Sequence, residues 1–191
     1  DNKTPYTADH EGDVFVAGTF TNYGTVDGKT VNGYIGANSL TVEEGGVLNT
    51  KITHSYAVAN TTVKGTFNLT ELNSHVDRTT ANTAPADQLL LTGTMTLDGG
   101  LVTLRDQEFT GNVQLSFEQE EKGLPANLTV KGDRNYAAQQ ITFYRGSTLT
   151  LDTAYTGTYT VGTLDAVGAG SVNVNGGALN VDTKLTTNAN G

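Results

Sequence analysis

The chain has 191 residues, enough for one domain or two small ones, and 36% of them are hydrophobic. It carries 11 Lys and Arg against 20 Asp and Glu, and the formal net charge of −9 argues against nucleic acid and anionic membranes as partners. There is no cysteine, which excludes disulfides and thiolate metal sites. No apolar run approaches the roughly 18 residues of a membrane span, so we expect no membrane insertion by this chain.

Three abundant residue types predict the local structure. Gly occurs 23 times, Thr 33 times and Asn 17 times. Thr is β-branched and favours extended backbone, whereas Gly and Asn accept the tight conformations of turns. The composition therefore favours strands with polar outer faces, separated by many turns.

The first half of the chain predicts short strands after a polar N-terminal segment. Residues 1–12 are polar and contain Pro5, so we expect them to lead into the first strand. Apolar residues then alternate with polar ones, which places each apolar pair on one face of a strand. Turn dipeptides, among them Gly45-Gly46 and Gly99-Gly100, separate the strands. The inward pairs of this half are Val14/Val16, Leu40/Val42, Phe67/Leu69 and Met95/Leu97.

One long segment interrupts this pattern. Residues 70–88 show no periodicity and contain Pro85, which predicts a loop that protrudes from the body of the protein. Loops of this length inside a compact domain are usually functional or disordered. Asp77 and Arg78 are therefore candidate binding residues.

The most regular stretch is residues 147–182. Alternation there predicts that Thr and Asn face outward, and no segment shows the 3.6-residue period of a helix. We expect an all-β protein. The residues predicted to face inward in this stretch are Leu149, Leu151, Val172, Val174, Leu179 and Val181.

Comparable inward pairs recur along the sequence. The steps between Val14/Val16, Leu40/Val42, Phe67/Leu69, Met95/Leu97, Leu149/Leu151 and Val172/Val174 are 26, 27, 28, 54 and 23 residues. A step of roughly 20 to 30 residues is typical of stacked supersecondary units. The pattern predicts one parallel β-helix, a solenoid, over residues 1–191. The alternative is an antiparallel β-sandwich, which produces the same strands and turns but usually contains a large aromatic core residue, and this chain has no Trp.

Residues 147–182 also resemble a known family. Leu149 and Leu151, then Tyr155-Thr156-Gly157, then residues 176–181 (GGALNV) are similar to the passenger-associated β-strand repeat of bacterial autotransporter passenger domains. Residues 18–26 and 43–50 resemble the coil-and-turn pattern of the same family. The resemblance implies a right-handed parallel β-helix that is exported through the outer membrane, displayed at the bacterial cell surface, and commonly active in adhesion or self-association. The chain would then be an excised or processed passenger fragment.

The sequence contains no pattern that predicts a catalytic or a metal-binding site. Residues 9–13 (DHEGD) offer oxygen ligands but lack the spacing of a calcium loop, and His10, His54 and His75 lie on separate segments. Ser147 lacks the glycine-flanked turn of a serine nucleophile. We expect no enzyme activity, no metal and no cofactor. The main alternative is a β-helical carbohydrate-active enzyme, because that scaffold can present paired carboxylates.

Binding by surface residues is the expectation that remains. Asp133, Arg134 and Tyr136 form a polar corner where an amphipathic ring and a cation can contact a partner. Outer rows of Thr and Asn can also form hydrogen bonds with another copy of the chain. The sequence thus predicts a structural and adhesive protein whose partner is a host-surface or matrix protein, a glycan, or itself. A β-sandwich adhesin domain is a further alternative.

Overall fold

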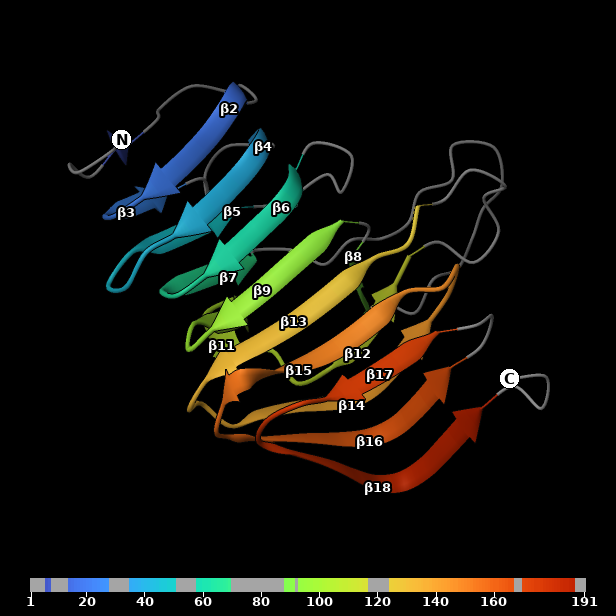
Figure 1. The fold of residues 1–191 in the computed structure, drawn as a ribbon. Helices are drawn as coiled ribbons and strands as arrows, with labels where there is room; N and C mark the ends of the chain where they lie inside the picture. The colour runs from blue at the N-terminus through green and yellow to red at the C-terminus, as the bar shows by residue number, and fades with distance from the viewer. Residues whose placement is uncertain are drawn as a thin grey trace.

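The computed structural model describes residues 6–7, 14–27, 35–50, 58–69, 88–91, 93–116, 124–166 and 170–187. Within these ranges the protein is all-β, with strands joined by short turns and no helix (Figure 1). A membrane-crossing helix is accordingly absent from the described ranges. The all-β prediction is confirmed.

The largest sheet has seven strands, and its spatial order follows the order of the chain. Every neighbouring pair in it is parallel. Figure 1 shows the arrows of this sheet pointing the same way and stacked side by side, in chain order from the N-terminal end of the molecule to the C-terminal end. Its strands are β2 (Val14–Asn22), β4 (Ile35–Val42), β6 (Val58–Val63), β9 (Thr94–Asp98), β13 (Asn127–Gly132), β15 (Thr148–Tyr155) and β17 (Ser171–Val174).

Two further sheets complete the fold. The six-stranded sheet contains β1 (Tyr6–Thr7), β3 (Thr25–Asp27), β5 (Val47–Thr50), β7 (Thr66–Leu69), β10 (Leu101–Leu104) and β11 (Gln107–Glu108). The five-stranded sheet contains β8 (Gln88–Leu91), β12 (Asn112–Leu115), β14 (Tyr136–Phe143), β16 (Thr158–Ala166) and β18 (Ala178–Thr187). All described strand pairs are parallel except β10 with β11, so the antiparallel sandwich is not the observed arrangement.

We define a layer as one strand of the seven-stranded sheet together with the strands that follow it before the chain returns to that sheet. Successive layers place aligned residues 20, 21, 34, 33, 21 and 23 positions apart. The aligned residues are Phe20, Leu40, Thr61, Met95, Leu128, Leu149 and Val172. The short layers are therefore nearly equal in length, and the two long ones contain the additional segments around residues 70–87 and 105–126.

This alignment corrects two of the predicted repeat positions. Phe67 and Leu69 lie in the six-stranded sheet, where Phe67 pairs with Leu48 and Val102, and not in line with Leu40. Val14 pairs with Ile35, so it does not occupy the position that precedes Leu40. The prediction failed here because inward alternation looks the same in every sheet, and the sequence period alone does not assign a strand to a sheet.

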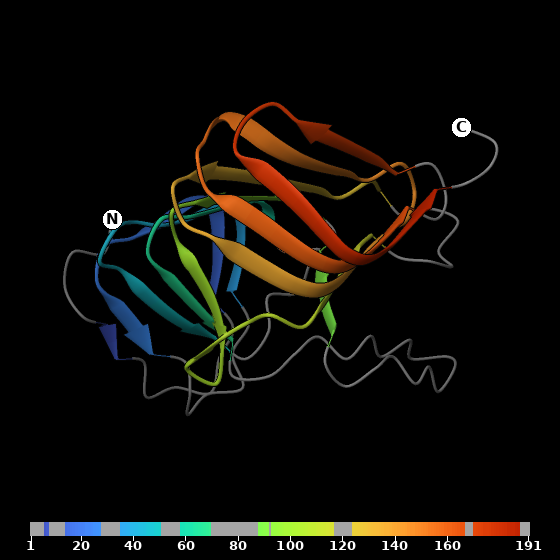
Figure 2. The ribbon, with the colours of Figure 1, turned by 90° about the horizontal axis from the view of Figure 1, so that it is seen from below.

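The core lies between the sheets, which face one another in the view of Figure 2. Aligned apolar side chains form columns that run from layer to layer, such as Leu97, Val130 and Leu151, which are at most 6% exposed. Outward positions of the same strands carry Thr, as the alternating burial of β9 and β13 shows. The inward and outward assignments for these strands are confirmed.

Glycine occupies the corners because successive layers approach closely there. A Cβ on Gly100 would lie 2.5 Å from the Val63 carbonyl carbon and 2.8 Å from the Lys64 amide nitrogen. A Cβ on Gly157 would meet the Arg134 carbonyl oxygen at 2.5 Å. Backbone atoms cannot rotate away as a side chain can, so a Cβ at either corner would force the two layers to shift apart.

A hairpin ends the six-stranded sheet. Residues 105 and 106 both have positive φ, 51° and 64°, and turn β10 back into the antiparallel strand β11. The side chain of Asn68 holds this turn. Its amide donates to Asp106 Oδ1 and to Asn49 Oδ1, each at 2.7 Å, and its carbonyl oxygen accepts from the Asp106 amide at 3.0 Å and from the Thr103 hydroxyl at 2.7 Å.

The last layer leaves part of the core open. Val174 is 51% exposed and Leu185 is 60% exposed, although Leu151 and Leu164 beneath them are at most 2% exposed. Val172, Leu179 and Val181 are partly buried, whereas Leu149 and Leu151 are fully buried. The predicted inward orientation of these residues in the 147–182 stretch is confirmed by their register, but full burial holds only for Leu149 and Leu151, because no described layer covers β17 and β18.

The predicted N-terminal segment and the predicted loop lie mostly outside the described residues. Within residues 1–12, Tyr6 and Thr7 form β1 and pair in parallel with β3. Gln88, the last residue of the predicted loop, is the first residue of β8.

Candidate functional site

The outer face of the seven-stranded sheet carries two rows of small polar side chains. One row consists of Thr21, Thr41, Thr62, Thr96, Thr129, Thr150 and Asn173. The parallel row, two positions earlier in each strand, consists of Thr19, Ser39, Asn60, Thr94, Asn127, Thr148 and Ser171. We call these fourteen residues the threonine face.

The spacing of the threonine face follows from sheet geometry. Neighbouring strands lie about 4.8 Å apart, and residues i and i+2 of a strand lie roughly 7 Å apart on the same face. The rows therefore form a regular grid of hydroxyl, methyl and amide groups. Most of these side chains are partly buried by their neighbours in the grid, and Thr19, Asn60, Ser171 and Asn173 are exposed.

Hydrogen bonds link side chains along the rows at the C-terminal end. The hydroxyls of Thr148 and Ser171 lie 3.0 Å apart, and the Asn173 amide donates to the Thr150 hydroxyl at 3.5 Å. Hydroxyl groups are both donors and acceptors, so each retains further capacity for a partner molecule. The face can thus bind a second polar surface without leaving its own groups unsatisfied.

Charged residues occupy the next outward position of the central strands. Glu43, Lys64, Asp98 and Lys131 follow one another from layer to layer with alternating sign. Lys64 Nζ and Glu43 Oε2 form an ion pair at 3.0 Å, and the hydrogen bond from Lys64 to Glu43 raises the pKa of Lys64 above its ordinary value. The threonine face itself contains no charged residue and is bordered on this side by a row whose charges compensate one another.

The structure places the predicted polar corner between β13 and β14. Asp133 and Arg134 are exposed, as expected, and Arg134 Nε donates to the Gly99 carbonyl at 3.1 Å. Tyr136, expected to present its ring to solvent, is instead 8% exposed, and its hydroxyl donates to the Gly100 carbonyl at 2.8 Å. Because Tyr136 is the first inward position of β14, it serves the core and cannot contact a partner.

Tyr136 belongs to a cluster of three buried tyrosines. Its ring centroid lies 6.3 Å from that of Tyr155 and 5.9 Å from that of Tyr159. The Tyr155 hydroxyl donates to the Arg134 carbonyl at 3.0 Å. Burial raises the pKa of Tyr155 to about 12 and the pKa values of Tyr136 and Tyr159 further. These phenols therefore stay neutral at physiological pH.

The structure assigns no catalytic, binding or metal-ligating role to the other candidate residues. Asp77, Arg78 and residues 9–13 lie outside the described residues. Ser147 is fully buried, and its hydroxyl donates to the Tyr144 carbonyl at 2.5 Å and accepts from the Ala126 amide at 2.9 Å, which is a structural role at the start of β15. Within the described ranges, no three His, Asp or Glu side chains are grouped so as to hold a metal ion.

Comparison of the chain with protein-family models, with curated proteins and with solved structures finds no match.

Sequence reasoning anticipated outer rows of Thr and Asn but not the threonine face itself. Which threonines stand in one row depends on the register between strands of different layers, which lie far apart in the chain. The signal that could have identified them is the recurring pattern of a polar residue, an apolar residue and Thr, as in Thr94-Met95-Thr96 and Thr148-Leu149-Thr150.

Proposed function

We propose that this chain is a structural and adhesive element of a bacterial cell surface, and that the threonine face mediates its association with further copies of itself. The single observation that carries this proposal is the pair of uninterrupted polar rows across seven strands. A repeating polar grid is complementary to a copy of itself, because each hydroxyl can donate to or accept from the hydroxyl opposite it.

Electrostatics favours contact at this face. The chain has a formal net charge of −9, so two copies repel one another in most orientations. The threonine face has no charged side chain, and the adjacent row alternates in sign from Glu43 to Lys131. Two copies that meet at this face bring together the surfaces where like charges oppose contact least.

We further propose that the layers are the coils of a right-handed parallel β-helix and that the chain is part of an autotransporter passenger. The parallel pairing in all three sheets, apart from β10 with β11, and the near-equal length of the short layers support a helical winding. The resemblance of residues 147–182 to the passenger repeat supports export and display at the cell surface. Such a scaffold extends by adding layers, which suits a protein that must project its adhesive face away from the cell.

Sedimentation velocity of the purified chain tests the proposed association. Thr96→Glu with Thr129→Glu introduces two carboxylates at the centre of the threonine face, where each would oppose a like charge on the partner copy. Thr160→Glu with Asn180→Glu adds the same charge at outward positions of β16 and β18. The first pair is expected to leave only monomer at concentrations where the control still associates. A chain that is monomeric at millimolar concentration before any substitution would refute the proposal.

A further inference from the structure

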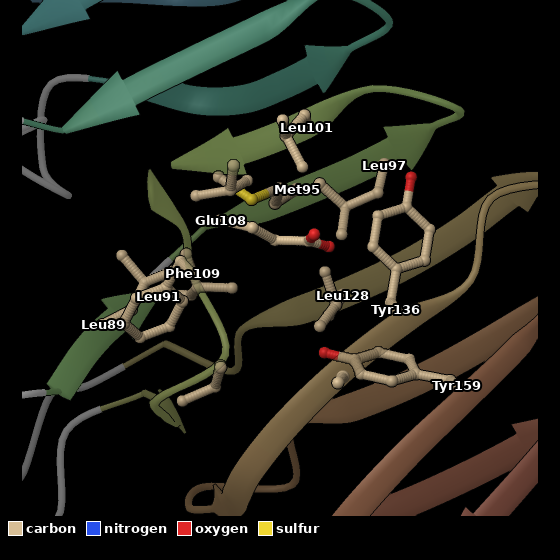
Figure 3. Close-up of a pocket in the computed structure, with 13 residues that line it drawn as sticks. Leu89, Leu91, Met95, Leu97, Leu101, Glu108, Phe109, Leu128, Tyr136 and Tyr159 are labelled. Atoms are coloured by element: carbon tan, nitrogen blue, oxygen red, sulfur yellow. The ribbon is translucent and has the colours of Figure 1, made fainter. Parts of the chain in front are cut away.

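A small cavity lies where the six-stranded sheet is interrupted. The hairpin strand β11 covers the edge of β10, so β10 does not pair with β14 of the next layer. The cavity lies at this discontinuity, and its walls come from strands β8 to β14 and from β16 (Figure 3). The Tyr136 hydroxyl, on β14, donates a hydrogen bond to the carbonyl of Gly100, which directly precedes β10.

The size of the cavity limits what it can hold. Its volume is about 30 Å³, compared with roughly 300 to 1,000 Å³ for the binding site of a drug-sized ligand. A water molecule needs about 10 to 15 Å³ of such space and two to four polar partners. The cavity thus has room for one water and at most a second.

One buried hydroxyl is directed into this space without a partner. Tyr159, on β16, is 3% exposed, and its ring packs against Tyr136. Figure 3 shows its hydroxyl directed toward the middle of the cavity. Within the part of the chain that the structure describes, this hydroxyl makes no hydrogen bond, in contrast to those of Tyr136 and Tyr155. A buried hydroxyl with no partner loses its hydration on folding and costs about 1 to 3 kcal/mol.

A second polar group faces the same space from the hairpin. Glu108 is the last residue of β11 and lines the cavity, and Figure 3 shows its carboxylate turned toward the centre. The remaining lining is mostly apolar, with Leu97, Phe109 and Leu128 among its side chains. A donor on one wall and an acceptor on another are what one bridging water requires.

We propose that this cavity is a water-binding site, in which an internal water accepts a hydrogen bond from the Tyr159 hydroxyl and donates one to the Glu108 carboxylate. The water completes the hydrogen bonding of Tyr159 and joins β16 to the hairpin. The water thereby links the five-stranded sheet to the six-stranded sheet beside β11, where the six-stranded sheet ends.

A crystal structure of the unmodified chain at a resolution that shows ordered water tests this site directly. The expected result is electron density for a water within hydrogen-bonding distance of Tyr159 Oη and of a Glu108 carboxylate oxygen. An empty cavity, or a side chain that fills it, would overturn the proposal.

Xenon binding provides a second readout that does not depend on seeing the water. Tyr159→Phe with Glu108→Ala removes both polar groups and leaves an almost wholly apolar space, which dries and accepts xenon. Tyr155→Phe is the matched control, because its hydroxyl bonds to the Arg134 carbonyl outside the cavity. Xenon is expected only in crystals of the chain that carries Tyr159→Phe with Glu108→Ala. Xenon in the unmodified chain would show a dry cavity and contradict the proposal.

Discussion

The corner glycines yield the most direct prediction about the fold. Replacing Gly100 by Ala places a Cβ 2.5 Å from the Val63 carbonyl carbon, 2.8 Å from the Lys64 amide nitrogen and closer still to the Val63 carbonyl oxygen. All three atoms belong to the backbone of the preceding layer, so relief requires the two layers to separate at this corner. Gly100→Ala is therefore expected to destabilise the protein.

The magnitude follows from two opposing effects. Forcing an extra carbon into a packed site costs about 1 to 3 kcal/mol, and the upper part of that range applies where backbone must move. The reduced freedom of the unfolded chain returns about 0.4 to 1 kcal/mol. A net loss of about 2 kcal/mol corresponds to a fall in Tm of roughly 4 to 8 °C for a chain of this size.

Thermal and urea unfolding, followed by circular dichroism, measure this loss. Gly18→Ala is the control, because no atom lies within 4 Å of the Cβ it would add. The control is expected to be as stable as the unmodified chain or slightly more stable. If Gly100→Ala unfolds at the same temperature as Gly18→Ala, the two layers do not approach one another closely at this corner.

Three further predictions concern the hairpin, the core columns and the buried tyrosines. Asn68→Ala leaves the groups around the hairpin turn without their partner, so urea unfolding is expected to show a loss of about 1 to 3 kcal/mol, against less than about 0.5 kcal/mol for the exposed Asn180→Ala. Leu151→Ala is expected to cost about 2 to 5 kcal/mol, whereas Val174→Ala, in the same column but 51% exposed, is expected to cost less than about 1 kcal/mol. Burial raises the pKa values of the clustered tyrosines above the unfolded value of about 10. Their contribution to the free energy of unfolding is therefore complete below pH 10 and is lost as the pH rises toward 12. Unfolding measured as a function of pH is expected to show this decline in stability, with a smaller slope in Tyr159→Phe.

Each of these has an outcome that contradicts it. Equal stability of the two Asn variants would mean that Asn68 does not hold the turn. Equal losses for Leu151→Ala and Val174→Ala would mean that the last layer is covered in solution. A stability that stays constant from pH 9 to pH 12 would place the tyrosines in contact with water.

The sequence predicted the strands and most turns because these depend on neighbouring residues. Alternation at Leu149 and Leu151 fixes which side chains face inward, and Gly99-Gly100 marks the corner between β9 and β10. The assignment of strands to sheets depends on contacts between distant residues. Phe67 was misplaced for that reason, since its local pattern is identical to that of a strand in the seven-stranded sheet.

The hairpin and the corner at Tyr136 show what local patterns do not reveal. The β10–β11 turn has Arg105 and Asp106 at positive φ, where Gly or Asn is the usual signal, and its support comes from Asn68 in another layer. Tyr136 follows three polar residues, yet it is the first inward position of β14, and its hydroxyl donates to the Gly100 carbonyl. In both cases the decisive partner belongs to the preceding layer and is distant in the chain.

Clustering of cells that display this chain is the most direct measure of whether the threonine face mediates self-association. Cells carrying the unmodified chain are expected to settle out of suspension, and Thr96→Glu with Thr129→Glu is expected to abolish settling at equal surface expression. Thr160→Glu with Asn180→Glu is predicted to leave settling unchanged. If cells with the substituted threonine face settle as fast as those with the control, this face does not mediate association and the proposed function is contradicted.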